Sequence, residues 1–198
     1  GQSCISVQRV FTHRDVAGPL AERVVAAVRA LTTGDPTDEK TDVGPLIDEA
    51  AARRVESWVA DAVAAGARVL TGGVRDGATY APTVLTDVPA SAQVSRDEVF
   101  GPVVVLDTVD SVDEAFARVN DSRFGLQAGV FTRDLQVAFR AARELEVGGV
   151  VIGDVPSFRA DQMPYGGVKD SGTGREGVHS AMEDLTEERV LVLTGIAL

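Results

Sequence analysis

Pro102-Val103-Val104-Val105-Leu106-Asp107-Thr108-Val109 decides the fold class of this 198-residue chain. An almost unbroken apolar run of this length is typical of a strand that is buried on both faces, as in a parallel sheet. A helix is predicted directly after it, because Ser111 and Glu114 form the pattern of a capping box in front of an apolar helix face. The segment therefore indicates a strand that leads into a helix.

The same alternation continues toward the C-terminus. Ala128 to Thr132 is a second predicted buried strand, and Asp134 can cap the helix that follows it. Gly148-Gly149 ends that helix, and Val150 to Ile152 begins a further strand. Strands that alternate with helices imply crossover connections and parallel pairing. We therefore predict an α/β fold, with a mostly parallel sheet and flanking helices.

The residues before this segment predict further elements. Residues 5–11 alternate between apolar and polar side chains, which indicates a strand. A helix with apolar positions from Leu20 to Leu31 is expected to stop at Gly34, and a second helix from Ile47 to Val63 is expected to stop at Gly66. Short strands are expected at Val69-Leu70 and at residues 80–85.

Two segments near the C-terminus differ from this pattern. Residues 153–174 form a long predicted loop rich in Gly, Pro, Asp and Ser, and loops of this length are often functional. Leu185 to Leu193 reads as an apolar strand, which as a free edge should seek a partner strand. We predict a catalytic domain over residues 1–184 and a C-terminal strand and tail over residues 185–198.

Composition excludes several classes of function. The formal net charge is −11, which argues against a nucleic-acid binder because such a protein needs a basic surface. No apolar run approaches the roughly 18 to 20 residues of a membrane span, and no signal-peptide pattern opens the chain. One cysteine fits a reducing compartment, and two widely separated histidines suggest no metal site. We therefore predict a cytoplasmic protein, and because the chain opens at Gly1 rather than Met we expect a longer parent polypeptide.

Cys4 is the single cysteine and a candidate nucleophile. A lone cysteine is more often a buried structural residue, because catalysis requires a thiolate that nearby groups stabilise. The context changes this interpretation. Gly1-Gln2-Ser3-Cys4 resembles the nucleophile motif of the aldehyde dehydrogenase superfamily, and further motifs of that family follow in order. These are Asp42-Val43-Gly44-Pro45-Leu46-Ile47, Ala81-Pro82-Thr83-Val84-Leu85, Glu98-Val99-Phe100-Gly101-Pro102-Val103, Asn120 to Phe131, and Pro164-Tyr165-Gly166-Gly167-Val168-Lys169-Asp170-Ser171-Gly172 with Gly174-Arg175-Glu176.

The resemblance implies the catalytic domain of an NAD- or NADP-dependent aldehyde dehydrogenase that begins at its nucleophile motif. Cys4 is then the nucleophile, which forms a thiohemiacetal and then a thioester on the way from an aldehyde to a carboxylic acid. Glu98 is implied to accept hydrogen bonds from the nicotinamide ribose, and Phe100 to pack near the nicotinamide. Leu126 is a candidate for the same pocket, with core packing as its alternative role.

The resemblance also implies substrate contacts. Ser3 and Ile5 flank the nucleophile and are candidate substrate-binding residues. Residues 156–161 resemble family members that oxidise small hydroxy- or acid-bearing aldehydes, so Arg159 is a candidate partner for an anionic group. Its alternative role is a structural ion pair with a residue such as Asp161. Gly153 departs from the asparagine of many relatives.

The family also uses a cofactor-binding domain, a glutamate general base and an asparagine oxyanion partner, all of which lie upstream of the nucleophile motif in relatives. We therefore expect the isolated chain to have little or no dehydrogenase activity. By its position, the tail matches the strand that bridges subunits in relatives, so the resemblance implies a homodimer or homotetramer through the C-terminal strand. Two other readings stay open: a non-catalytic assembly domain of the same fold, and a cofactor-independent thiol esterase or acyl-transferase that uses Cys4 alone.

Overall fold

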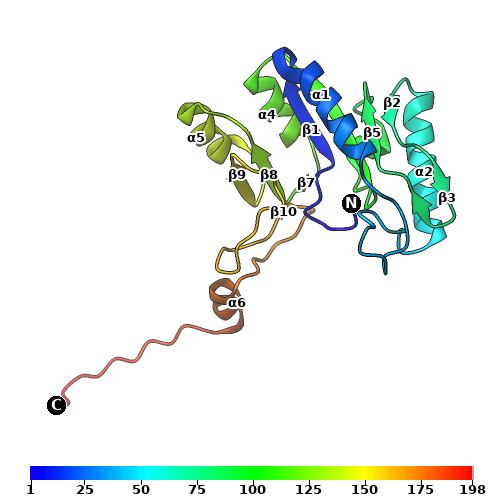
Figure 1. Cartoon of the computed structure of the whole chain (residues 1–198). Helices are drawn as coiled ribbons and strands as arrows, with labels where there is room; N and C mark the ends of the chain where they lie inside the picture. Colours follow the sequence, from blue (N-terminus) through cyan, green and yellow to red (C-terminus); the bar gives the residue numbers. More distant parts are fainter. Residues whose placement is uncertain (198) are drawn as a thin grey trace.

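A four-stranded sheet is the largest sheet of the computed structural model, which describes residues 1–197 (Figure 1). The strand order is β1-β6-β5-β2, where β1 is Arg9–His13, β6 is Val103–Val109, β5 is Thr83–Thr86 and β2 is Arg68–Thr71. β6 pairs in parallel with both β1 and β5, while β2 joins the edge antiparallel to β5. The apolar run at residues 102–109 therefore lies in the interior of the sheet, as predicted.

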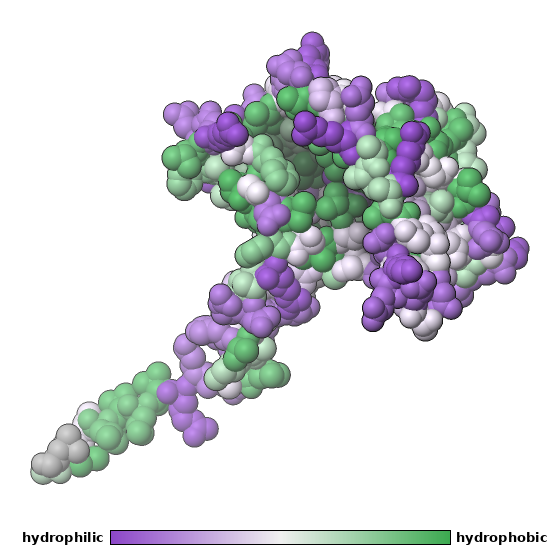
Figure 2. Space-filling view, viewed as in Figure 1, coloured by the Kyte–Doolittle hydropathy of each residue, from purple (hydrophilic) through white to green (hydrophobic). Residues whose placement is uncertain are grey.

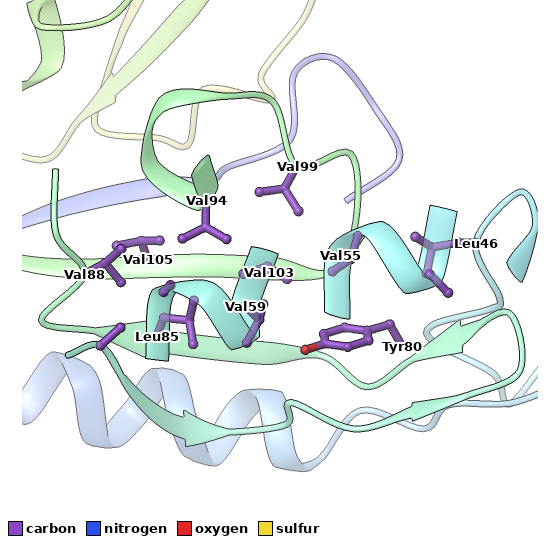
Figure 3. Close-up of a cluster of buried hydrophobic side chains, with 13 residues drawn as sticks. Leu46, Val55, Val59, Tyr80, Leu85, Val88, Val94, Val99, Val103 and Val105 are labelled. Carbon is purple, nitrogen blue, oxygen red and sulfur yellow. The ribbon is translucent and has the colours of Figure 1, made fainter. Parts of the chain in front are cut away.

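Helices cover both faces of this sheet. α1 (Arg14–Arg29) contacts β2, β5 and β6 on one face. α2 (Glu49–Ala64) and α3 (Gln93–Arg96) lie on the other face, over a cluster of buried side chains (Figure 3). Members of this cluster from the strands and helices include Val55, Val59, Leu85, Val94, Val103 and Val105. This arrangement confirms the predicted α/β fold with flanking helices.

Local sequence signals account for the ends of α2 but not for the end of α1. The Asp48 side chain accepts a hydrogen bond of 2.7 Å from the Ala51 backbone N–H, and Gly66 follows the C-cap of α2 with a φ of 111°. Gly34 is not the stop of α1, which ends at Arg29. The chain leaves the helix early because the Thr32 N–H binds the Asp42 carboxylate at 2.8 Å.

A second βαβ unit packs beside the first sheet. α4 (Val112–Asn120) leads to β8 (Gln127–Val130), and α5 (Leu135–Glu144) crosses to β9 (Gly149–Ile152), which pairs in parallel with β8. The two caps predicted from sequence are present, because Ser111 accepts from the Glu114 N–H at 3.1 Å and Asp134 accepts from the Gln136 N–H at 2.7 Å. β8 and β9 form a two-stranded sheet of their own, so the strands that the sequence pattern placed in one sheet are hydrogen-bonded in two.

Two short ladders complete the fold. β3 (Arg75–Asp76) pairs with β4 (Thr79–Tyr80), and β7 (Phe124–Gly125) pairs with β10 (Val168–Lys169), both antiparallel. The second ladder ties the predicted long loop to the body of the molecule.

The C-terminal strand predicted at Leu185 to Leu193 is not formed within this single chain. Leu185 is the last residue of α6 (Val178–Leu185), and residues 186–197 follow without helix or strand. Val190 to Leu193 are exposed and form an apolar extension that projects from the body (Figure 2). A strand requires hydrogen bonds from a neighbour, which no other segment of the described chain supplies here. No helix within residues 1–197 is long and apolar enough to cross a membrane.

Tyr80 leads to a prediction about stability at alkaline pH. Burial raises the pKa of Tyr80 to about 12 from its ordinary value of 10.0. The raised pKa favours the folded state fully below pH 10, and this contribution disappears as the pH rises toward about 12. Between pH 10 and about pH 12, we expect the free energy of unfolding of the native chain to fall by about 2 kcal/mol because of Tyr80. Urea unfolding at a series of pH values should show a smaller loss in Tyr80→Phe, and equal losses in the two chains would refute this origin.

Candidate active site

The loop that carries Cys4 is a tight turn packed against the start of β6. The Ser6 N–H donates to the Ser3 carbonyl at 3.0 Å, and Cys4, which is exposed and forms no disulfide, lies within that turn. Gly1 lies so close to Gly101 that a Cβ added at Gly1 would overlap the Gly101 carbonyl oxygen. The nucleophile motif and the Glu98 motif, about a hundred residues apart in sequence, are therefore in contact.

Gln2 joins this turn to a third motif. Its Nε2 donates to the Pro45 carbonyl at 3.1 Å, and its Oε1 accepts from the Ile47 N–H at 3.0 Å. The amide thus bridges the Cys4 turn to the loop that precedes α2. Ser3 is exposed and Ile5 is half-buried at the two sides of Cys4.

Gln8 holds the segment that contains Glu98. Its Nε2 donates to the carbonyls of Val94 and Asp97 at 3.0 and 2.7 Å, and its Oε1 accepts from the Val99 N–H at 2.9 Å. Glu98 is exposed between these anchored residues, and its carboxylate has no protein partner among residues 1–197. Gln8 was not singled out from the sequence, since nothing in its local pattern indicates contacts some 90 residues away.

Phe100 adopts an unusual backbone conformation. Its φ is 48°, in the left-handed region that non-glycine residues rarely occupy, and its side chain is 41% exposed. The Arg54 guanidinium donates to the neighbouring Val99 carbonyl at 2.7 Å and helps to fix this turn. An exposed aromatic ring on a strained backbone is a feature often found at functional sites.

The long loop and the turn after it (residues 153–177, called the signature loop) bring Tyr165 to the nucleophile. The Tyr165 hydroxyl lies 3.3 Å from the Cys4 Sγ, and the tyrosine is only 5% exposed. Backbone hydrogen bonds in both directions join Tyr165 to Glu176, at 3.0 and 2.6 Å. Tyr165 belongs to a family motif in the sequence, but no local pattern indicates its role, because the contact with Cys4 spans 161 residues.

Arg159 is attached to the same cluster. Its guanidinium lies over the Tyr165 ring, 4.3 Å from the ring centroid, and forms an ion pair of 2.8 Å with Glu176. The predicted alternative of a structural ion pair therefore has Glu176, not Asp161, as its partner. Stacking on the ring places the charge of Arg159 one side chain away from Cys4.

Leu126 lies at the junction between β7 and β8. Its carbonyl accepts from the Gly148 N–H at 3.0 Å, and Gly148 in turn packs against the Gly166 carbonyl, next to Tyr165. Within the described residues, hydrogen bonds thus join the Leu126 carbonyl to Gly148 and Gly149, and Gly148 lies against Gly166 of the signature loop. The predicted place of Leu126 in the cofactor pocket stays a prediction.

Two basic residues of the signature loop have structural contacts. The Lys169 ammonium donates to the carbonyls of Asn120 and Ser122, and the Arg175 guanidinium donates to the carbonyls of Gly167 and Gly174.

The backbone of Gly153 is in the left-handed region, with a φ of 83°. Glycine and asparagine are the residues that most readily adopt this conformation, which gives a physical reason for their exchange at this position. Within residues 1–197, no cluster of His, Cys, Asp and Glu could hold a metal ion.

The fold agrees with the comparisons with known proteins. The model of the aldehyde dehydrogenase family matches residues 1–191. This chain belongs to the aldehyde dehydrogenase family. It is 51% identical over 193 residues to a 3-sulfolactaldehyde dehydrogenase of Priestia aryabhattai, covering 98% of this chain and 40% of that protein.

Other relatives and solved structures agree. A lactaldehyde dehydrogenase of Methanococcus maripaludis is 40% identical over 196 residues, covering 99% of this chain and 42% of that protein. Aldehyde dehydrogenase 21 from Physcomitrella patens, solved with the reaction product succinate, has a TM-score of 0.96 and 47% identity, over 99% of this chain and 41% of that one. This chain therefore spans about two fifths of the length of the relatives it matches.

Proposed function

We propose that this chain is the nucleophile-bearing part of an NAD- or NADP-dependent aldehyde dehydrogenase that oxidises an aldehyde to a carboxylic acid. The observation that carries the proposal is the packing of the Cys4 turn against the Glu98 segment, through Gly1 and Gly101. A thiol that can attack a carbonyl and a carboxylate that can accept from ribose hydroxyls are thereby held on adjoining segments of one site.

The proposed chemistry starts at the sulfur of Cys4. Its thiolate attacks the aldehyde carbon, a C–S bond forms, and the carbonyl π electrons move to oxygen. The Cys4 backbone N–H is a candidate donor to this oxyanion, and one such donor contributes about 3 kcal/mol in comparable sites. When the oxyanion collapses, the C=O bond re-forms and the C–H electron pair leaves as hydride, so that the carbon is oxidised to a thioester.

Hydrolysis completes the cycle. Water adds to the thioester carbon, its proton passes to a general base that the resemblance places outside this chain, and the C–S bond breaks. The acid is released and the Cys4 thiolate is restored. A bound oxidised nicotinamide dinucleotide supplies the two-electron acceptor for the hydride.

Glu98 suits the cofactor. Its carboxylate is exposed and unpaired within the described residues, and a carboxylate can accept from two hydroxyls at once. Gln8 fixes the backbone on both sides of it, so little ordering of the backbone is required on binding. Phe100, exposed two residues later, offers an aromatic surface for the nicotinamide. Two solved relatives, the glyceraldehyde-3-phosphate dehydrogenases of Methanocaldococcus jannaschii and Bacillus halodurans, are complexes with NADP.

The proposed substrate is a small aldehyde with an anionic or hydroxyl group. The Arg159 side chain is 45% exposed, and its ion pair with Glu176 engages one of its nitrogens. The remaining guanidinium donors can therefore meet a carboxylate or sulfonate. The names of the relatives, with sulfolactaldehyde, lactaldehyde and the product succinate, support this class. Ser3 and Ile5, on either side of Cys4, are proposed to line the substrate site.

A substitution at Glu98 tests the proposal in the longer dehydrogenase that we propose contains this chain. We expect aldehyde-dependent reduction of NAD or NADP by that protein, and little or none by residues 1–198 alone. Glu98→Gln keeps the side-chain shape but replaces one acceptor oxygen by a donor. Its KM for the cofactor should rise about tenfold, because hydrogen bonds to a charged acceptor contribute about 1.5 to 3 kcal/mol, while the KM for the aldehyde changes little.

Glu22→Gln, on the exposed outer part of α1, is the matched control and should leave both constants unchanged. An unchanged cofactor KM in Glu98→Gln would contradict the ribose-binding role. Turnover of a thioester without any nicotinamide cofactor would instead favour the esterase or acyl-transferase reading. Absence of both activities in a folded protein with a reactive aldehyde present would favour an assembly domain.

A further inference from the structure

We infer that Tyr165 is a positioning residue whose hydroxyl donates a hydrogen bond to the Cys4 thiolate and stabilises it for attack. This inference rests on the proposed function, since it concerns the state of the proposed nucleophile. The inference concerns the Tyr165 hydroxyl. The face of the Tyr165 ring has a separate contact, with the Arg159 guanidinium.

The geometry fixes the hydroxyl beside the sulfur. The distance from the Tyr165 oxygen to the Cys4 Sγ is 3.3 Å, within the usual range for a hydrogen bond to sulfur. The tyrosine is almost fully buried, while the cysteine is exposed. Two backbone hydrogen bonds to Glu176 hold the tyrosine backbone in place. The position of the tyrosine is thus fixed, and its hydroxyl can set the orientation of the Cys4 side chain.

The direction of the hydrogen bond follows from which group holds its proton. Burial, then the neighbouring Cys4, raises the pKa of Tyr165 to about 12, so the phenol stays protonated at pH values where thiols ionise. A thiolate has no proton to donate, so the hydroxyl must be the donor. The charged groups at the ring are the Arg159 guanidinium above it and Glu176, which pairs with Arg159 and so offsets much of its charge.

Alkylation of Cys4 by iodoacetamide measures this effect without a cofactor, because the sulfur forms a C–S bond and iodide leaves with the electron pair. Cys4 is the single cysteine of the chain, so the modification is unambiguous by mass spectrometry. We expect Tyr165→Phe to shift the midpoint of the pH–rate profile upward by about half to one pH unit. This shift corresponds to about three- to tenfold slower alkylation near neutral pH. At high pH the rates should converge, because both thiols are then fully ionised.

Tyr80→Phe is the matched control, since it removes the same atom from the chain's one other tyrosine. Its profile should superimpose on that of the native chain. If Tyr165→Phe fails to fold, the Tyr80→Phe chain can be produced with 3-fluorotyrosine, which then stands only at position 165. The fluorine nearly preserves the shape of the side chain and makes its phenol a stronger hydrogen-bond donor. The midpoint should then shift downward.

Two results would overturn the inference: a Tyr165→Phe profile identical to the native one, or a fluorotyrosine profile that does not shift. These outcomes are separate from failure of the proposed function. A protein that proves inactive toward aldehydes can still show the predicted alkylation shifts, and an active dehydrogenase can lack them.

Discussion

Aldehyde oxidation should fall by a factor of about 10⁴ or more in Cys4→Ala of the complete enzyme, because the variant has no nucleophile for the covalent route. The Cys4 side chain is exposed in its turn and is not part of the hydrophobic core. Its truncation should therefore leave the fold and the cofactor site intact. Steady-state assays of kcat/KM for the aldehyde, together with fluorescence titration of the reduced cofactor, separate the loss of chemistry from a loss of binding.

A second variant, Cys4→Ser, tests whether a hydroxyl can replace the thiol as nucleophile. Serine keeps a side chain of similar size and can still accept from Tyr165, but its hydroxyl ionises far less readily than a thiol. We expect the serine variant to be nearly as inactive as the alanine variant, while both bind the cofactor like the native enzyme. More than about one hundredth of native activity in Cys4→Ala would contradict covalent catalysis at this position. Loss of cofactor binding in both variants would instead assign Cys4 a structural role.

Local patterns in the sequence were sufficient for most elements of the fold. The strand at residues 103–109, the caps Ser111 and Asp134 and the stop at Gly66 each depend on neighbours within a few residues, and each is present in the structure. The family resemblance assigned Cys4 and Glu98 to one reaction, and the structure adds that their motifs lie in contact through Gly1 and Gly101.

Contacts between distant segments could not be predicted in this way. Gln8 reaches Val99 across 91 residues, and Tyr165 reaches Cys4 across 161, with no local pattern that links either pair. The partner of Arg159 was wrong for the same reason: Asp161 is nearer in sequence, but the hydrogen bonds between Tyr165 and Glu176 bring Glu176 to the guanidinium. The tail strand depends on a partner segment that residues 1–197 do not supply.

Gly148→Ala should be the most damaging of the conservative substitutions in the signature-loop region. A Cβ at this position would overlap the Gly166 carbonyl oxygen and lie 3.1 Å from the Leu126 carbonyl oxygen, and backbone atoms cannot rotate away as a side chain can. Gly148 is also fixed from the other side, because its N–H donates to the carbonyls of Gly125 and Leu126. We expect a loss of about 2 to 4 kcal/mol in the free energy of unfolding, measured with urea.

The same substitution tests whether the fold positions the site. Gly166 follows Tyr165 directly, so displacing Gly166 should carry the hydroxyl away from the Cys4 sulfur. The alkylation profile of Gly148→Ala should then resemble that of Tyr165→Phe, and adding Tyr165→Phe should shift it no further, because two changes that remove one interaction are not additive. Gly174→Ala, in the same loop, is the matched control: the nearest atom to its added Cβ is 3.8 Å away, so stability and alkylation should stay close to native. A stable Gly148→Ala chain with native alkylation would show that the crossing of Gly148 and Gly166 does not hold Tyr165 in place.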